Sequence, residues 1–211
     1  MQTIEIANPA ARLKDCAGVQ RVPHPALELF IMRDFLTPEL CAALVSRIDR
    51  HRRPSDIADD LGIANFRTSE SCDLDRGDPA VAKVDAMICD LLGLPPQHGE
   101  PLQGQRYAVG QEFKPHTDTF NPNGADYYLH CADSGQRTWT AMIYLNQPGE
   151  GGATRFKTIG KTVQPELGKL LAWNNLAADG RPNNATLHQG MKVRRGTKYV
   201  LTKWFRQRPY G

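Results

Sequence analysis

The first half of the chain carries two stretches in which apolar residues recur every three or four positions, the period of a helix with one buried face. Each stretch begins with a capping side chain followed by proline, at Thr37 and at Asp78, and this combination is typical of a helix start. The apolar positions are Leu40, Leu44, Val45 and Ile48 after the first start, and Val81, Val84, Ile88 and Leu91 after the second. Gly93 follows the second stretch and favours its termination. We therefore predict two amphipathic helices.

From Leu102 onward, the pattern changes to short runs that are rich in strand-forming residues. These runs are residues 102–109, 138–145, 169–173 and 198–205. The stretches NQPGEGGATRF and QPELGKLLAW combine glycine with proline, which is typical of hairpin turns and bulges. No internal repeat or linker separates the two halves. We therefore predict one α+β domain over residues 1–211, with helical support over about residues 1–98 and a β-sandwich or barrel over about residues 99–211.

Composition and charge place the chain among soluble globular proteins. Its 211 residues are 40% hydrophobic and 23% charged, with a net charge of +3 at pH 7. This small surplus does not favour a nucleic-acid partner, and the basic residues near the C-terminus fit a solvated face. The sequence has no apolar run of the roughly 18 residues that cross a bilayer and no secretion signal, so we expect a cytoplasmic protein without a membrane partner. Its five scattered cysteines form no CxxC pair, which indicates reduced, mostly buried thiols.

The stretch KPHTDTF, residues 114–120, places His116 and Asp118 two positions apart in a region rich in strand formers. Residues i and i+2 of a strand point to the same face, so the imidazole and the carboxylate can be directed at one point. A polar strand edge is the alternative for such a pair, and a third ligand would distinguish the two. His188 lies after the predicted hairpins, where a later strand can return beside the first, although a surface loop next to Gly190 is again an alternative. Two histidines and one carboxylate occupy one face of an octahedral ferrous ion and leave three positions for substrates.

Several blocks of the sequence resemble the catalytic domain of the prolyl 4-hydroxylases, which are iron(II)- and 2-oxoglutarate-dependent dioxygenases. The blocks are EPLQGQRYAVGQEFKPHTDTF, SGQRTWTAMIYLNQPGEGGATRF, GKLLAWNN, LHQG and GTKYVLTKWF, and the similarity extends upstream to FRTSESCDLDRGDP and HGEPLQ. They occur in the order of the family and cover approximately residues 30–208. The resemblance implies a double-stranded β-helix, or jelly-roll, core with N-terminal supporting helices.

Carried over position by position, the resemblance implies a full set of iron and cosubstrate contacts. The iron ligands that it implies are His116, Asp118 and His188. Lys198 falls where the family places the basic residue that pairs with the distal carboxylate of 2-oxoglutarate, and an ammonium suits that role because it donates charge-assisted hydrogen bonds to a dianion. The hydroxyl groups of Tyr107 and Thr140 match positions that also contact 2-oxoglutarate in the family.

On the substrate side, the resemblance implies an open groove for a peptidyl proline. The residues that it places there are Arg67, Ser69, Arg137 and Trp204. Arg137 is the best suited of them, because a guanidinium can hydrogen-bond a peptide carbonyl. Two positions depart from the family pattern, since Phe113 stands where tyrosine is common and Arg206 stands where histidine is common. Both changes fall on the substrate side, so the iron chemistry can be intact while the acceptor differs.

The activity implied by the resemblance is hydroxylation of an unactivated C–H bond, with decarboxylation of 2-oxoglutarate to succinate and carbon dioxide and with ascorbate as the reductant. The number of matching blocks favours prolyl 4-hydroxylation of a peptide or protein. The two departures permit a hydroxylase of a free amino acid or another small molecule. A non-catalytic module that binds iron and 2-oxoglutarate is a third interpretation, which the complete set of ligand and lysine positions disfavours.

Overall fold

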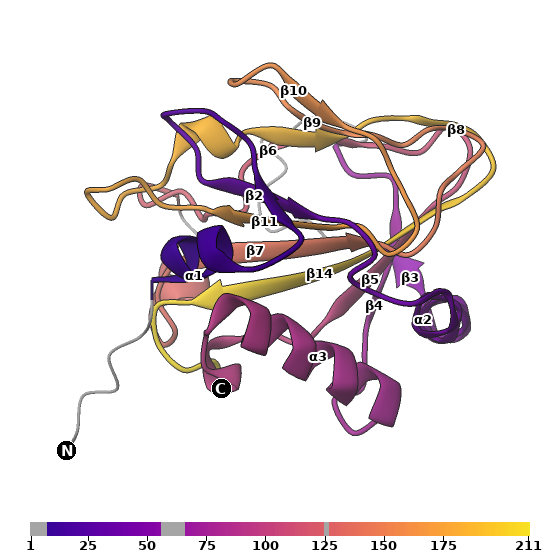
Figure 1. The fold of residues 1–211 in the computed structure, drawn as a ribbon, viewed down its shortest axis with the longest axis horizontal. Helices are drawn as coiled ribbons and strands as arrows, with labels where there is room; N and C mark the ends of the chain where they lie inside the picture. Colours follow the sequence, from indigo (N-terminus) through magenta and orange to yellow (C-terminus); the bar gives the residue numbers. More distant parts are fainter. Residues whose placement is uncertain (1–7, 56–65, 125–126) are drawn as a thin grey trace.

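Antiparallel β-sheets form the framework of the protein, as the computed structural model shows for residues 8–55, 66–124 and 127–211 (Figure 1). Within these residues, the larger sheet has eight strands in the order β1 (Val19–Arg21), β2 (Leu29–Met32), β11 (Leu170–Asn174), β7 (Arg137–Tyr144), β14 (Lys198–Arg206), β5 (Gln103–Tyr107), β4 (Glu70–Asp73) and β3 (Arg53–Pro54). The smaller sheet has the order β10 (Lys161–Val163), β9 (Thr154–Phe156), β12 (His188–Gly190) and β6 (Phe113–His116). A third, two-stranded sheet pairs β13 (Val193–Arg195) with β8 (Glu150–Gly151). Every pairing is antiparallel.

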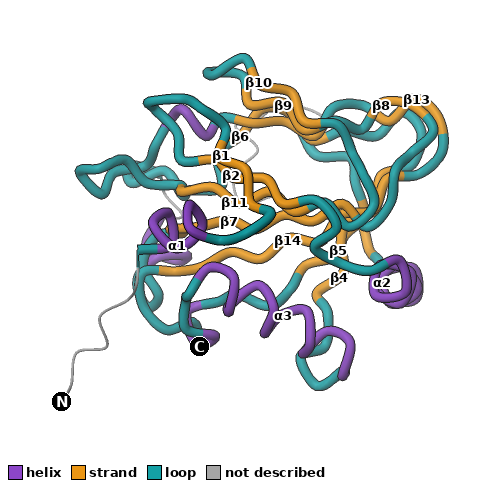
Figure 2. The backbone as a smooth tube through the Cα atoms, viewed as in Figure 1, coloured by secondary structure: helices purple, strands orange, loops and turns teal. Residues whose placement is uncertain are grey.

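The eight-stranded sheet lies between the helices and the smaller sheet (Figure 2). It separates two hydrophobic clusters, one on the side of the helices and one on the side of the smaller sheet. Strand β7 shows the alternation that produces them, because successive side chains of a strand point to opposite faces. Ala141 and Ile143 belong to the cluster on the helix side, whereas Met142 and Tyr144 belong to the cluster that includes Phe156 of the smaller sheet. Two facing antiparallel sheets confirm the predicted double-stranded β-helix core and the α+β class.

Helices cover the outer face of the larger sheet (Figure 1). They are α1 (Pro9–Asp15), α2 (Pro38–His51) and α3 (Pro79–Leu92), while a short α4 (Tyr127–Cys131) lies between β6 and β7 in the chain, and single 3-10 turns occur at Pro96–His98 and Asn184–Thr186. Both predicted helix starts are confirmed: the Thr37 hydroxyl accepts a hydrogen bond from the backbone N–H of Leu40, and the Asp78 carboxylate accepts one from Ala80. Gly93 ends α3 with a positive φ of 66°, which glycine adopts without strain.

The N-terminal part supplies more than helical support. Strands β1 and β2 extend one edge of the eight-stranded sheet beside β11, and β3 and β4 extend the other edge beside β5. These strands are only two to four residues long, so the period-two pattern that identifies a strand is too short to recognise in them. The prediction of helical support over residues 1–98 is therefore incomplete, because this part also forms both edges of the larger sheet.

The five cysteines all lie in the described residues and are free thiols, four of them buried. This confirms the prediction of reduced, mostly buried thiols. Burial raises the pKa of Cys89 to about 11, so this thiol stays protonated at neutral pH. In the part of the chain that the structure describes, no helix combines the length and the apolar character that a membrane span requires.

Candidate metal centre

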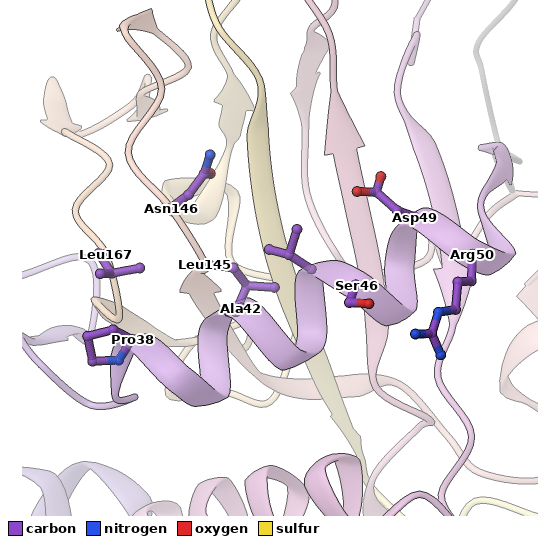
Figure 3. Close-up of a pocket in the computed structure, with 9 residues that line it drawn as sticks. Pro38, Ala42, Ser46, Asp49, Arg50, Leu145, Asn146 and Leu167 are labelled. Carbon is purple, nitrogen blue, oxygen red and sulfur yellow. The ribbon is translucent and has the colours of Figure 1, made fainter.

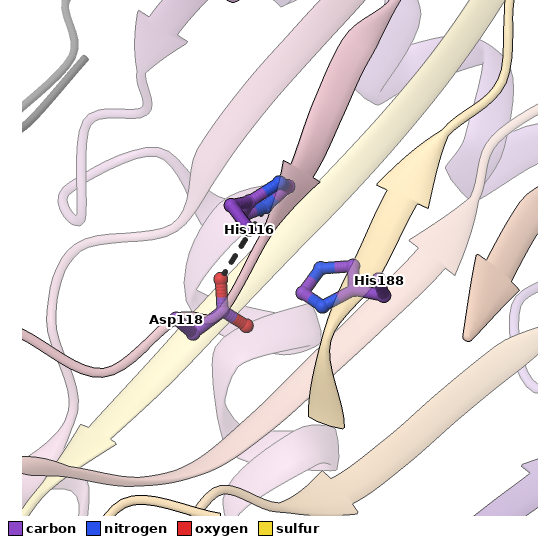
Figure 4. Close-up of side chains that lie close together, drawn as sticks. All are labelled: His116, Asp118 and His188. Carbon is purple, nitrogen blue, oxygen red and sulfur yellow. Dashed lines mark ion pairs between the residues drawn. The ribbon is translucent and has the colours of Figure 1, made fainter. Parts of the chain in front are cut away.

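The three predicted iron ligands converge between two neighbouring strands of the smaller sheet (Figure 4). His116 ends β6, and His188 begins β12 directly opposite it in the antiparallel register. Asp118 lies in the bend two residues beyond His116, so it reaches the site from the end of the strand and not from within it. Their ligand atoms all lie within 4.8 Å of one another, and His116 Nε2 is 3.9 Å from Asp118 Oδ1. The later strand that carries His188 thus returns beside the first, as predicted.

Both histidines present the same ring nitrogen to the centre. The Nδ1 atom of His116 lies 2.8 Å from the carbonyl oxygen of Lys114, and that of His188 lies 2.9 Å from the carbonyl oxygen of Thr186. A carbonyl can only accept, so each Nδ1 carries the proton and each Nε2 keeps its lone pair for a metal. Burial, reinforced by the neighbouring His188, lowers the pKa of His116 to about 3. Two imidazoles that each offer Nε2, together with a carboxylate, fit the donor set that ferrous iron prefers.

Asp118 is held by contacts on its side chain and on its backbone. The hydroxyl of Thr140 donates to Oδ2 at 2.7 Å, and Arg137 Nη1 lies 3.4 Å from the backbone carbonyl oxygen. Burial alone would raise the pKa of Asp118, but the nearby His188 and His116, with Arg137 and the Thr140 hydroxyl, hold that pKa below its ordinary value. Asp118 is therefore an ionised carboxylate that is ready to bind a cation.

Lys198 lines the same cavity as the three ligands. Its side chain is buried, and none of the ion pairs among the described residues involves it. The nearest aromatic rings are those of Tyr107 and Tyr144, whose centroids lie 5.0 and 5.4 Å from Nζ. Burial lowers the pKa of Lys198 to about 7. An ammonium in such surroundings is stabilised by an anion, as the predicted pairing with 2-oxoglutarate requires.

The two predicted hydroxyl contacts differ in the structure. Tyr107 lines the cavity beside Lys198, with which it pairs across β5 and β14, and its hydroxyl donates to Gln105 Oε1 at 2.9 Å. Thr140 is fully buried behind the ligand carboxylate, and its only proton goes to Asp118. The expectation that Thr140 contacts 2-oxoglutarate is therefore not supported by this geometry, which gives its hydroxyl another partner.

A buried charge cluster occupies the substrate side of the centre. Glu100 accepts two hydrogen bonds from Arg137, each at 2.7 Å, and a third from Arg206 at 3.0 Å. Arg206 also donates to the carbonyl oxygen of His130, next to the last residue of α4. Arg137 is therefore engaged with Glu100 and is not oriented for a peptide carbonyl in this conformation. The prediction missed Glu100, although it stands in the block HGEPLQ that contributed to the resemblance.

Replacing Glu100 with glutamine is expected to lower the free energy of unfolding by about 1–3 kcal/mol, because two buried guanidinium groups lose their counter-charge while an acceptor remains. Urea unfolding measures this loss. The exposed Glu150, paired with the exposed Arg194, is a control whose glutamine variant should change stability by less than about 1 kcal/mol. The neighbouring arginines lower the pKa of Glu100 against the opposing effect of burial, so its stabilisation should be present above pH 4.5 and be lost as the pH falls further. Equal losses in the two variants would contradict a buried cluster.

The remaining predicted substrate residues lie around the cavity with contacts of their own. Arg67 donates to the hydroxyls of Ser69 and Ser71, and its guanidinium lies 4.9 Å from the ring centroid of Phe113. Ser69 is buried, which is a poor position for a direct substrate contact. Trp204 lines the cavity as predicted, and its ring lies 4.0 Å from the Arg137 guanidinium carbon.

The Phe113 ring stacks on His116 at a centroid distance of 3.5 Å. The departure at position 113 thus touches an iron ligand as well as the pocket edge.

A wider groove of about 640 Å³ runs between α2 and the end of β7 (Figure 3), lined by residues such as Val45, Leu145 and Leu167. It shares no lining residue with the cavity of the metal centre.

A jelly-roll core whose smaller sheet carries two histidines, with one carboxylate in the bend beside them, is typical of the class of non-haem iron oxygenases. Comparison with known proteins agrees with this class. The model of the 2OG-Fe(II) oxygenase superfamily matches residues 102–206. The structure of the viral collagen prolyl hydroxylase from Paramecium Bursaria Chlorella virus-1, in its 2OG complex, aligns with a TM-score of 0.67 and 25% sequence identity, covering 84% of this chain and 95% of that one.

Curated relatives give the family more closely. Probable prolyl 4-hydroxylase 10 of Arabidopsis thaliana is 30% identical over 204 residues, covering 85% of this chain and 69% of that protein. Human prolyl 4-hydroxylase subunit alpha-1 is 32% identical over 182 residues, covering 86% of this chain. The chain belongs to the prolyl 4-hydroxylase family of 2OG-Fe(II) oxygenases. It spans 32% of the length of the human relative.

Proposed function

We propose that this chain is an iron(II)- and 2-oxoglutarate-dependent dioxygenase that hydroxylates carbon 4 of a proline residue in a peptide or protein. The observation that carries the proposal is a cluster of two histidines and one carboxylate that shares its cavity with the buried ammonium of Lys198, which has no ion-pair partner among the described residues. Ferrous iron with 2-oxoglutarate and dioxygen supplies the oxidising power for C–H hydroxylation, releasing succinate and carbon dioxide, and ascorbate keeps the iron reduced.

The protein residues bind, orient and exclude water. His116 and His188, each through Nε2, and the ionised Asp118 would hold the metal, which would supply the site where 2-oxoglutarate and dioxygen bind. The Lys198 ammonium binds the distal carboxylate of 2-oxoglutarate and fixes its orientation. Trp173 and Trp204 are buried walls of the cavity and keep bulk water away from the reacting carbon.

A free amino acid or another small molecule is the second candidate acceptor. The observation that favours it is the engagement of Arg137 by Glu100, together with buried Arg206 where the family commonly has histidine. Because the guanidinium groups of Arg137 and Arg206 donate to Glu100, they have fewer N–H donors left for the backbone of a peptide substrate. Prolyl 4-hydroxylation of a peptide remains the first candidate, because the curated relatives named as prolyl 4-hydroxylases match most of this chain.

The deciding experiment measures succinate formation from 2-oxoglutarate in the presence of iron(II) and ascorbate, with a proline-rich peptide, with free proline and with no acceptor. We expect peptide-dependent succinate and a mass gain of one oxygen on the peptide. Turnover that requires free proline and ignores the peptide would transfer the activity to the second candidate. Iron and 2-oxoglutarate binding without turnover on the peptide or on free proline would contradict prolyl hydroxylation and favour a binding module or a different small-molecule acceptor.

A further inference from the structure

Two fully buried side chains, Thr140 and Asn175, form a chain of hydrogen bonds behind the ligand carboxylate. Asn175 Nδ2 donates to Thr140 Oγ1 at 2.8 Å, and Thr140 Oγ1 donates to Asp118 Oδ2 at 2.7 Å. Thr140 lies on β7, and Asn175 directly follows β11, the strand that pairs with β7 in antiparallel register. The backbone N–H of Asn175 also donates to the carbonyl oxygen of Thr138 at 2.7 Å, so the pairing with β7 continues to Asn175 and brings the two side chains together.

The direction of this chain follows from the groups themselves. An ionised carboxylate can only accept, so the single hydroxyl proton of Thr140 goes to Asp118. The lone pair of the hydroxyl then needs a donor, which the amide nitrogen of Asn175 supplies. With its amide reversed, Asn175 would present an oxygen that competes with Asp118 for the same proton. The donation from Asn175 polarises the hydroxyl and strengthens its bond to the carboxylate.

The position of Asn175 is unfavourable for folding. Its Oδ1 atom is buried and has no hydrogen-bond partner among the described residues, and a buried unpaired acceptor costs free energy. A leucine, which has the same number of side-chain heavy atoms, would bury no such unpaired acceptor at this position. The amide therefore fits a role in which its N–H group is required at the metal centre.

We propose that Thr140 and Asn175 are positioning residues for the metal ligand Asp118 and that neither contacts 2-oxoglutarate. By occupying Oδ2, the pair fixes the carboxylate so that Oδ1, which lies 3.9 Å from His116 Nε2, remains for the metal. Such outer contacts orient metal ligands and change metal affinity by 10- to 100-fold when they are removed, on the order seen in other metal sites. The proposal rests on the iron-dependent part of the proposed function and not on the identity of the acceptor.

The test is a titration of the metal-free protein with Co(II), followed by visible absorption, in the wild type and in Thr140→Val, Thr140→Ser and Asn175→Leu. We expect Thr140→Val and Asn175→Leu each to weaken Co(II) binding about tenfold, and Thr140→Ser, which keeps the hydroxyl, to restore most of it. Thr138→Val is the matched control, because Thr138 lies on the same strand and its hydroxyl donates to the carbonyl oxygen of Phe205. Its Co(II) affinity should equal that of the wild type.

Two further measurements separate this role from the alternatives. With the Co(II) site saturated, the affinity of the variants for 2-oxoglutarate should change by less than about twofold, and thermal unfolding of the metal-free variants should show that each still folds cooperatively. Unchanged Co(II) affinity in both variants, or a loss confined to 2-oxoglutarate binding in Thr140→Val, would overturn the proposal. If the wild type binds no Co(II), the assignment of the metal centre is wrong as well. If the wild type binds Co(II) but the iron-loaded enzyme does not hydroxylate the peptide, this inference stands and only the proposed acceptor is wrong.

Discussion

Replacing His116 or Asp118 with alanine is expected to abolish succinate formation, both with a peptide and without an acceptor, while the domain stays folded. Each variant removes one of three protein ligands from the centre, and two ligands do not hold ferrous iron with the required open face. Neither residue belongs to the two hydrophobic clusters that stabilise the sheets. Activity should fall below detection, and thermal unfolding followed by circular dichroism should change little in the metal-free proteins.

A histidine outside the centre provides the matched control for this prediction. His51 is exposed at the end of α2, and its alanine variant should keep full activity. Co(II) titration adds a readout that does not depend on turnover, because both ligand variants should lose the Co(II) absorption of the wild type. Wild-type turnover in either ligand variant would remove that residue from the metal centre, and loss of the folded state would make its role structural.

The ligand set could be predicted because the resemblance to the family implies all three residues. The local pattern is compatible with that set, since His116 ends a strand and the hairpins after it return His188 to the neighbouring strand, as the register confirms, whereas Asp118 reaches the site from the bend beyond the strand. The helix starts at Thr37 and Asp78 were equally predictable, because a cap is satisfied within three residues of itself.

The contacts that were not predicted join residues far apart in the sequence. Nothing local to Arg137 shows that Glu100 and Arg206 will meet it in the folded protein. The hydroxyl of Thr140 was assigned to 2-oxoglutarate because the family pattern gives a residue type but not the neighbour that takes its proton. Such side-chain pairings depend on the packing of the whole sheet, and a single sequence does not specify which of several partners is reached first.

Replacing Lys198 with alanine should weaken 2-oxoglutarate binding by about 2–5 kcal/mol, which is roughly 30-fold to 5,000-fold in Kd. The reason is that a carboxylate of the cosubstrate would enter a buried cavity from which the ammonium that lines it has been removed. Equilibrium binding of 2-oxoglutarate to the Co(II)-loaded protein measures the change. The Co(II) affinity itself should stay within about twofold of the wild type, because Lys198 is not a ligand. A normal 2-oxoglutarate affinity in this variant would assign the distal carboxylate to another residue.

The titration of Lys198 makes the same interaction pH-dependent. Burial lowers the pKa of Lys198 from 10.5 to about 7 in the free protein. Between these two values the unfolded chain binds more protons than the folded chain, so the contribution of Lys198 to the free energy of unfolding rises with pH over this range. A bound dianion favours the ammonium, so above pH 7 binding must take up a proton, and 2-oxoglutarate affinity should fall by up to tenfold per pH unit. His116, with a pKa near 3, and Tyr107, whose pKa burial raises, do not titrate between pH 7 and 9. Lys198→Arg keeps a permanent charge, so its binding curve should be flat over this range, and a wild-type affinity that is equally flat would show that the cosubstrate does not pair with Lys198.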